Sequence, residues 1–109
     1  MTIEKTYPEN LKNTKIYDLI TAQTTKKLNE CYGERIKPQE ICIYTTDSGT
    51  RCIAILGEDG NLYRSSGNAA IVAVENGLDI LGSEFASRSI VPVKKTSKNG
   101  REYCSAVLE

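Results

Sequence analysis

From Glu34 onward, hydrophobic and polar residues alternate in short runs that are separated by turn-forming residues. The three runs cover residues 35–46, 51–56 and 62–65. Pro38 interrupts the first run, and the turns fall at Asp47–Thr50 and Glu58–Asn61. Because these connections are too short for a crossover, the pattern predicts three strands in an antiparallel meander.

The period of the pattern then lengthens to that of a helix. Apolar residues recur on one helical face at Ile71, Val74, Leu78 and Leu81. Ser66 or Asn68 can cap the start, and Gly82 stands where a helix commonly ends. The spacing therefore predicts a helix over residues 68–81.

A hairpin is expected from Arg88 to Val107, where two β-prone runs flank the segment VPVKKTSKNGREY. Asn99-Gly100 is predicted to form its tight turn, because glycine reaches positive φ freely and asparagine does so comparatively well. The last two strands of the domain would thus lie side by side.

The first third of the chain has a weaker pattern. Residues 1–14 are polar and show no period, which is typical of a tail or loosely attached arm. Residues 15–22 are expected to form a strand, and residues 25–32 a short helix that ends at Gly33.

From Glu34 onward the predicted elements are three strands, a helix and two further strands. This is the chain order of a five-stranded OB-like barrel. We therefore expect a mainly β protein with one helix, in which residues 15–109 form a single barrel domain behind an N-terminal extension. Barrels of this kind bind oligonucleotides over strands 2 and 3 and through two loops. Here those loops would be residues 47–50 and 96–100.

Charge adds a local feature to this picture. The 109 residues hold 14 cations and 14 anions, so the net charge is zero. Residues 41–87 are mainly acidic, whereas residues 88–109 carry five cations against two anions. Four of these cations gather in the hairpin: Lys94, Lys95, Lys98 and Arg101. Their mutual repulsion favours an anionic partner, most simply a phosphate backbone. The alternative is a solvated hairpin whose lysines prevent edge-to-edge aggregation.

Cysteine and histidine content narrows the possible chemistry. The chain has no histidine, and its four cysteines lack C-x-x-C spacing, so neither zinc nor another cofactor is expected. The turn at residues 47–50 does not place Cys42 opposite Cys52, which favours reduced, mostly buried thiols. Without histidine no serine or cysteine has its usual general base, and we expect no enzyme.

No apolar run is long enough to span a bilayer, and the first ten residues are polar. We therefore expect no membrane association and a cytoplasmic location.

Single-strand binding also requires aromatic faces on which bases can stack. Tyr44, Tyr63 and Tyr103 lie on the predicted strands, although core packing is the usual role of a strand tyrosine. Tyr63 is the preferred candidate, because Leu62 would point inward and Arg64 is adjacent. Arg51 opens the second strand and is expected either to reach phosphate or to serve as a surface charge near Asp47.

Three stretches read LNECYGERIKPQEICIYTT, ILGEDGNLYRSSGNAAIVAVENGLDILG and VKKTSKNGREY. Together they resemble the small single-stranded-DNA-binding proteins of bacteriophages that infect Gram-positive hosts. The matching positions are Asp59, Gly60, Tyr63, Ser66, Leu81, Gly82, Ser97, Lys98, Gly100 and Arg101. The resemblance implies a protein that coats single strands during phage or mobile-element replication, with replication proteins as further partners. A glycine-rich linker with an acidic tail, present in bacterial relatives, is missing here.

The sequence thus predicts non-catalytic, largely sequence-independent binding of single-stranded DNA. A protein-interaction module, an inhibitor or adaptor of a host protein, is the alternative, and the neutral net charge favours it. OB-type binders occur as monomers, dimers and tetramers, so a homo-oligomer fits as well as a monomer does.

Overall fold

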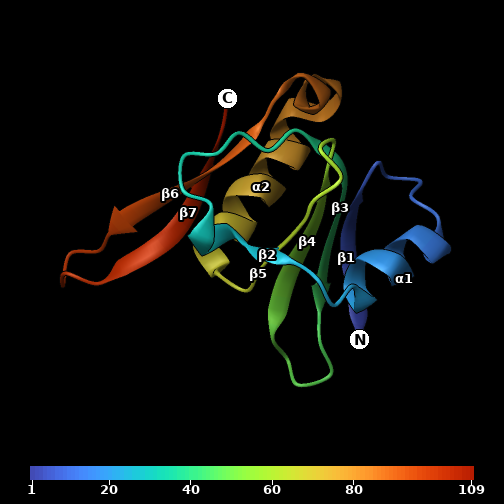
Figure 1. The fold of residues 1–109 in the computed structure, drawn as a ribbon, viewed down its shortest axis with the longest axis horizontal. Coiled ribbons are helices and arrows are strands. Elements are labelled where there is room, and N and C mark those ends of the chain that lie inside the picture. The colour runs from blue at the N-terminus through green and yellow to red at the C-terminus, as the bar shows by residue number, and fades with distance from the viewer.

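The computed structural model describes the whole sequence, residues 1–109. Its elements in chain order are β1 (Thr2–Tyr7), α1 (Asn13–Thr21), β2 (Lys26–Lys27), the 3-10 turn η1 (Leu28–Glu30), β3 (Pro38–Thr45), β4 (Arg51–Gly57), β5 (Leu62–Ser65), α2 (Asn68–Leu81), the 3-10 helix η2 (Gly82–Ser87), β6 (Ile90–Thr96) and β7 (Glu102–Leu108). Five strands form a mixed sheet in the order β1-β3-β4-β5-β2, and β6 and β7 form a separate hairpin that projects from the body (Figure 1). No helix combines the length and the apolar character needed to cross a bilayer.

The predicted five-stranded OB-like barrel with one helix is wrong. There are two α-helices, and the sheet takes two of its strands, β1 and β2, from the N-terminal third. The hairpin is bonded to the segment before β3: Ile36 and Ile90 exchange backbone hydrogen bonds of 2.8 Å, and the Gly33 N–H donates to the Pro92 carbonyl at 2.9 Å. No barrel closes: β2 runs parallel to β5 and forms the edge of the sheet, pairing Lys26 with Tyr63, while β6 and β7 pair only with each other.

The meander, the second helix and the hairpin are confirmed. β3, β4 and β5 pair antiparallel, and the register shifts between Pro38 and Glu40, where the proline was expected to interrupt the first strand. The helix spans residues 68–81 as its apolar spacing predicts. These segments agree with prediction because their connections are short and their hydrophobic period is unambiguous.

The N-terminal third differs from prediction in each of its three segments. Residues 2–7, expected to be part of a tail, form β1 and pair antiparallel with β3. Residues 15–22 were expected to be a strand, but residues 13–21 form α1; Ile16, Leu19 and Ile20 follow the i, i+3, i+4 spacing of a helix. The helix expected over residues 25–32 is replaced by β2 and η1.

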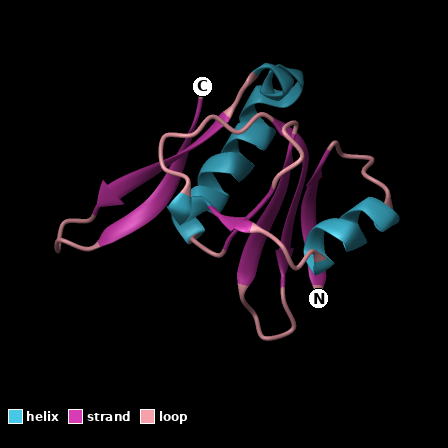
Figure 2. Cartoon of the chain, viewed as in Figure 1, coloured by secondary structure: helices cyan, strands magenta, loops and turns pink.

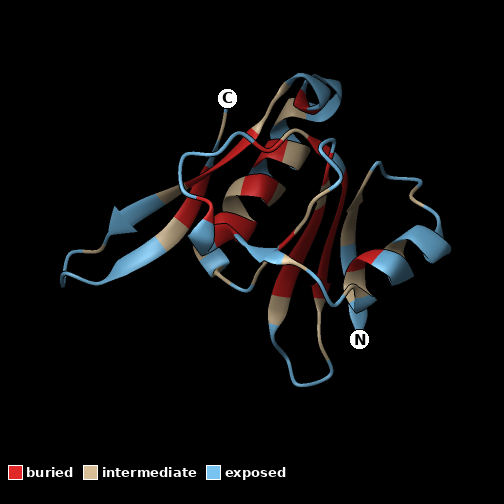
Figure 3. Ribbon diagram, in the orientation of Figure 1, coloured by how far each residue is buried: buried red, intermediate tan, exposed pale blue.

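The sheet stands between the two helices, so both of its faces are buried (Figures 2 and 3). Ile41, Ile43, Ile53 and Ile55 pack on the α2 side with Ile71 and Val74. Cys42, Tyr44, Cys52 and Ala54 pack on the α1 side with Leu19. Burial on both faces explains why the central strands are almost continuously apolar rather than alternating.

All three hairpins are closed by the same kind of turn. At the hairpin tip the Gly100 N–H donates to the Ser97 carbonyl, the Ser97 N–H donates to the Arg101 carbonyl, and Gly100 has φ +83°. Gly49 and Gly60 occupy the equivalent left-handed position. The prediction that Asn99 also takes positive φ is wrong, because this is a type I turn followed by a glycine bulge.

The cysteines behave as expected. Cys42 pairs with Ala54 in the register, and Cys52 pairs with Tyr44, so the two thiols are not opposite one another. All four cysteines are free and three are buried.

Candidate nucleic-acid interface

A groove of about 880 Å³ lies between the end of β5 and the start of β7. Two tyrosines, Tyr32 and Tyr103, line it and remain 38% and 40% exposed. Lys27 and Arg64 provide its cations, and Glu102 is its one acidic residue. The remaining lining is mostly small and polar: Thr25, Leu28, Asn29, Thr50, Cys52, Ser65, Ser66, Gly67 and Cys104.

The groove exists because two strand edges face one another without pairing. One wall is made by three consecutive residues of β7, from Glu102 to Cys104. The other wall is made by Ser65, at the end of β5, and by the next two residues, Ser66 and Gly67. Consecutive residues of a strand point to alternate faces, so a wall made of neighbours is an edge. The walls converge at the Cys104 carbonyl, which lies 3.8 Å from the position that a Cβ on Gly67 would take.

Tyr32 lies against the β7 wall. The pKa of its hydroxyl is raised by desolvation and by the neighbouring Cys104 thiol. Tyr32 thus reaches the β7 wall from the segment after η1, and Tyr103 belongs to β7 itself. The two rings are the exposed aromatic surfaces of this hollow.

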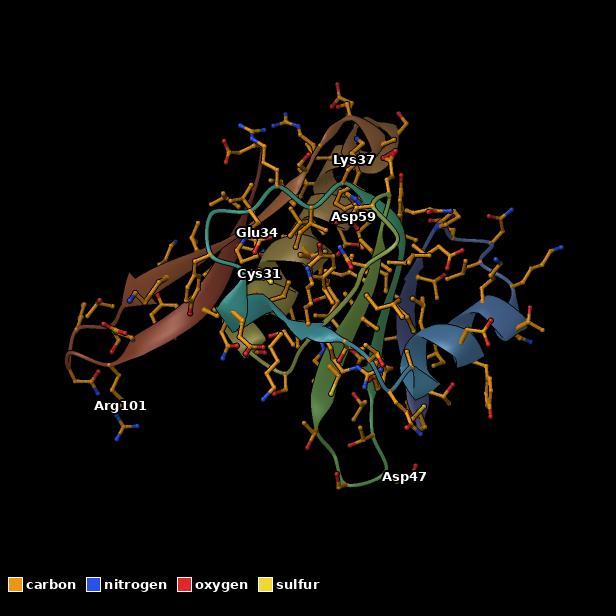
Figure 4. The ribbon with its side chains drawn as sticks, viewed as in Figure 1. Cys31, Glu34, Lys37, Asp47, Asp59 and Arg101 are labelled. Atoms are coloured by element: carbon orange, nitrogen blue, oxygen red, sulfur yellow. The ribbon has the colours of Figure 1, made fainter.

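The hairpin holds the predicted cations in solvent. Lys94 pairs with Glu102 at 3.6 Å, whereas Lys95, Lys98 and Arg101 form no ion pair. Arg101 lies at the tip of the projecting hairpin and points away from the body (Figure 4). Lys95 pairs with Tyr103 in the register and so shares its face, which brings a free cation beside a groove tyrosine.

Arg51 is not free to bind phosphate. Its guanidinium donates to Glu4 at 2.9 Å and also to Glu75 on α2, and the hydrogen bond to Glu75 is the main cause of its raised pKa. The arginine thus ties β1 and α2 to the start of β4. Both alternatives weighed from sequence, phosphate contact or a charge near Asp47, are replaced by this structural role.

Arg64 lines the groove but is anchored at the end of α1. Its Nη2 donates to the carbonyl oxygens of Leu19 at 2.9 Å and Ile20 at 2.8 Å. These carbonyls lie in the last turn of α1, which has no further helical partner for them. The guanidinium therefore contributes positive charge to the groove wall, its Nη2 serves the helix, and its buried Nε has no hydrogen-bond partner.

Tyr44 and Tyr63 are core residues and not stacking platforms. They are 3% and 2% exposed, and the Tyr63 hydroxyl donates to the Asp59 carboxylate at 2.9 Å. Leu62 was expected to point inward and to leave Tyr63 in solvent, but both faces of the sheet are covered. Tyr63 packs among the isoleucines on the α2 side, and Leu62 packs on the α1 side.

The interface therefore keeps five of the predicted residues in accessible positions: Lys94, Lys95, Lys98, Arg101 and Tyr103. It adds Lys27 and Tyr32, which the sequence reasoning missed. The sequence feature that indicates these two residues is the cationic pair Lys26-Lys27, followed closely by Tyr32. It was missed because the segment was expected to be a short helix without a function.

The buried tyrosine and thiol predict a characteristic pH dependence of stability. Burial raises the pKa of Tyr63 from its ordinary 10.0 to about 12, and that of Cys42 from 9.0 to about 11. Both groups lose protons more readily in the unfolded chain, so their stabilisation is complete below pH 9 and is lost as pH rises to 12. The pKa of Asp59 is lowered, chiefly by the Asn61 backbone N–H, so its contribution is lost in acid.

With no histidine in the chain, we expect the free energy of unfolding to stay constant between about pH 5 and 7 and to fall above about pH 9. Urea unfolding followed by circular dichroism across this range measures it. Tyr63→Phe should be less stable at neutral pH by about 1 kcal/mol and should show a shallower alkaline decline. A decline of equal steepness in the variant would contradict the assignment.

No protein-family model matches this chain, and no curated protein or solved structure matches it either. The resemblance to phage single-stranded-DNA-binding proteins therefore stays a prediction.

Proposed function

We propose that this protein binds single-stranded DNA without catalysis and with little base preference. The observation that carries the proposal is the groove in which Tyr32 and Tyr103 are both exposed, with the free cations of the hairpin directly beyond it. Stacking surfaces beside a cationic track are the two requirements for non-specific single-strand binding.

In this proposal the phosphates follow the hairpin. Lys95, Lys98 and Arg101 have no acidic partner, so no ion pair must be broken before they meet an anion. Lys27 extends the positive charge along the β2 wall. The zero net charge of the chain does not oppose this, because ions screen the acidic surface beyond roughly one Debye length, about 8–10 Å.

The test is a titration of the protein into labelled oligo-dT and into a duplex of equal length, at two salt concentrations. The single strand should bind better, and log K should fall against log salt with a slope of about 0.7 for each phosphate neutralised. Absence of binding to oligo-dT at low salt would sink the proposal.

A second candidate, the protein-interaction module, has one specific observation in its favour. An unpaired strand edge also accepts an extended peptide, which would add to β7 as a further strand. Such binding depends little on salt and does not require oligonucleotide. The same titration separates the two candidates, because only the first gives a salt-dependent complex with oligo-dT.

A further inference from the structure

The ladder of the hairpin fixes which backbone groups face the groove. Ser89 and Glu109 exchange backbone hydrogen bonds of 2.7 and 2.9 Å, and the Ser97 N–H donates to the Arg101 carbonyl at 2.8 Å. In an antiparallel pair such bonded positions alternate with positions whose N–H and C=O point outward. Along β7 the outward positions are therefore Glu102, Cys104, Ala106 and Leu108.

The outward backbone N–H and C=O of Glu102 face the groove and have no hydrogen-bond partner. No backbone hydrogen bond outside the strand ladders involves Glu102 or Cys104, and no side chain bonds the Glu102 N–H. Its carboxylate pairs with Lys94 of β6 at 3.6 Å. Cys104 lies deeper, where its carbonyl approaches Gly67, so Glu102 is the accessible member of the edge.

We infer that the free edge of β7 hydrogen-bonds the Watson–Crick edges of unpaired bases, through the N–H and C=O of Glu102. In an extended residue these two groups point the same way, as an adjacent donor and acceptor. Every nucleobase has an adjacent donor and acceptor on its Watson–Crick edge. Tyr103, the next residue, supplies a ring for stacking beside this pair.

This inference rests on the proposed function and explains two of its features. A duplex uses its Watson–Crick edges internally, so only an unpaired base can bind the β7 edge. All four bases offer an adjacent hydrogen-bond donor and acceptor, so the β7 edge favours none of them strongly. Selection for single strands would then come from the backbone, and affinity from the cations and the tyrosines.

One arm of the test changes the DNA. Oligo-dT is compared with an oligonucleotide of N3-methylthymidine, which keeps the charge and the stacking face but has lost the N3–H donor. Wild-type protein should bind the methylated strand about fivefold or more weakly, as expected for lost hydrogen bonds. Equal binding of the two strands would overturn the inference and leave the proposed function standing, whereas failure to bind either strand would overturn both.

The second arm changes the protein. Glu102→Pro removes the outward N–H, and proline is tolerated where an edge N–H takes no part in the ladder. Glu102→Ala removes the same side chain but keeps the N–H. Thr96→Pro is the matched control, because Thr96 pairs with Glu102 in the register and its free N–H points away from the groove.

Glu102→Pro should bind oligo-dT about fivefold more weakly than Glu102→Ala, because the N–H donor is lost while the C=O acceptor remains. Thr96→Pro should bind and discriminate like wild type. If Thr96→Pro loses as much affinity as Glu102→Pro, the loss arises from the shape of the hairpin and the inference is overturned. Circular dichroism melting of the three variants identifies any that unfold, and the methylated-strand comparison on wild-type protein decides the matter independently.

Discussion

Replacing Lys95, Lys98 and Arg101 together with alanine is expected to lower the affinity for single-stranded DNA by about 100-fold at 0.1 M salt. Each cation that neutralises a phosphate contributes about 0.7 to the slope of log K against log salt, so three of them contribute about 2. The measurement is oligo-dT binding by fluorescence anisotropy between 0.05 and about 0.5 M salt, a range in which this counterion effect is large. Folding should be unaffected, since all three side chains are exposed and none forms an ion pair.

The control variant replaces three exposed cations that do not line the groove: Lys12, Lys15 and Arg35, of which Arg35 pairs with Glu109 at 3.1 Å. This variant has the same net charge as the hairpin variant but should keep nearly the wild-type salt slope. If both variants bind alike, the effect is one of overall charge. If the hairpin variant binds normally, its lysines serve to discourage edge pairing, which is the alternative function of cations on an exposed strand.

Truncating the groove tyrosines should have the second large effect, of a different kind. Tyr32→Ala and Tyr103→Ala should each cost about 1–3 kcal/mol of binding free energy, the usual value for one stacked base. The salt slope should stay unchanged, because no phosphate contact is lost. The phenylalanine variants keep the ring and should bind within a few-fold of wild type.

Tyr17 provides the control for exposed aromatic surface. It is 67% exposed on α1 and does not line the groove, so Tyr17→Ala should leave binding intact. Anisotropy titrations at one salt concentration suffice for the comparison. A loss of affinity in Tyr17→Ala equal to that in the groove variants would show that the strand follows another surface.

Local pattern was enough to predict the centre of this fold. The strands around Ile43 and Ile53 and the helix around Ile71 follow from short turns and clear periods. The sequence could not predict where an element lies when its position depends on partners far away in the chain. β2 is two residues long, with no hydrophobic pattern of its own, yet it pairs with β5 and forms the edge of the sheet.

The site shows the same division. The cations of the hairpin were predictable, because a tight turn holds them in solvent whatever the rest of the fold does. The hydrogen-bond partners of Arg51 and Arg64 could not be predicted, since they lie on β1, α1 and α2, between 24 and 47 residues away in the chain. Tyr63 was misplaced because burial of the second face of the sheet depends on α1, which the sequence pattern assigned to a strand.

The position of β1 and β2 in the sheet also has a consequence for synthesis of the chain. β1 pairs with β3 and β2 pairs with β5, so residues 2–27 leave the ribosome before any of their partners exist. The meander β3-β4-β5, by contrast, has only local connections and can pair as soon as it emerges. Ile16 and Leu19 therefore stay uncovered during synthesis until both β3 and β4 have been made, and we expect the N-terminal third to pack onto a meander that has already formed.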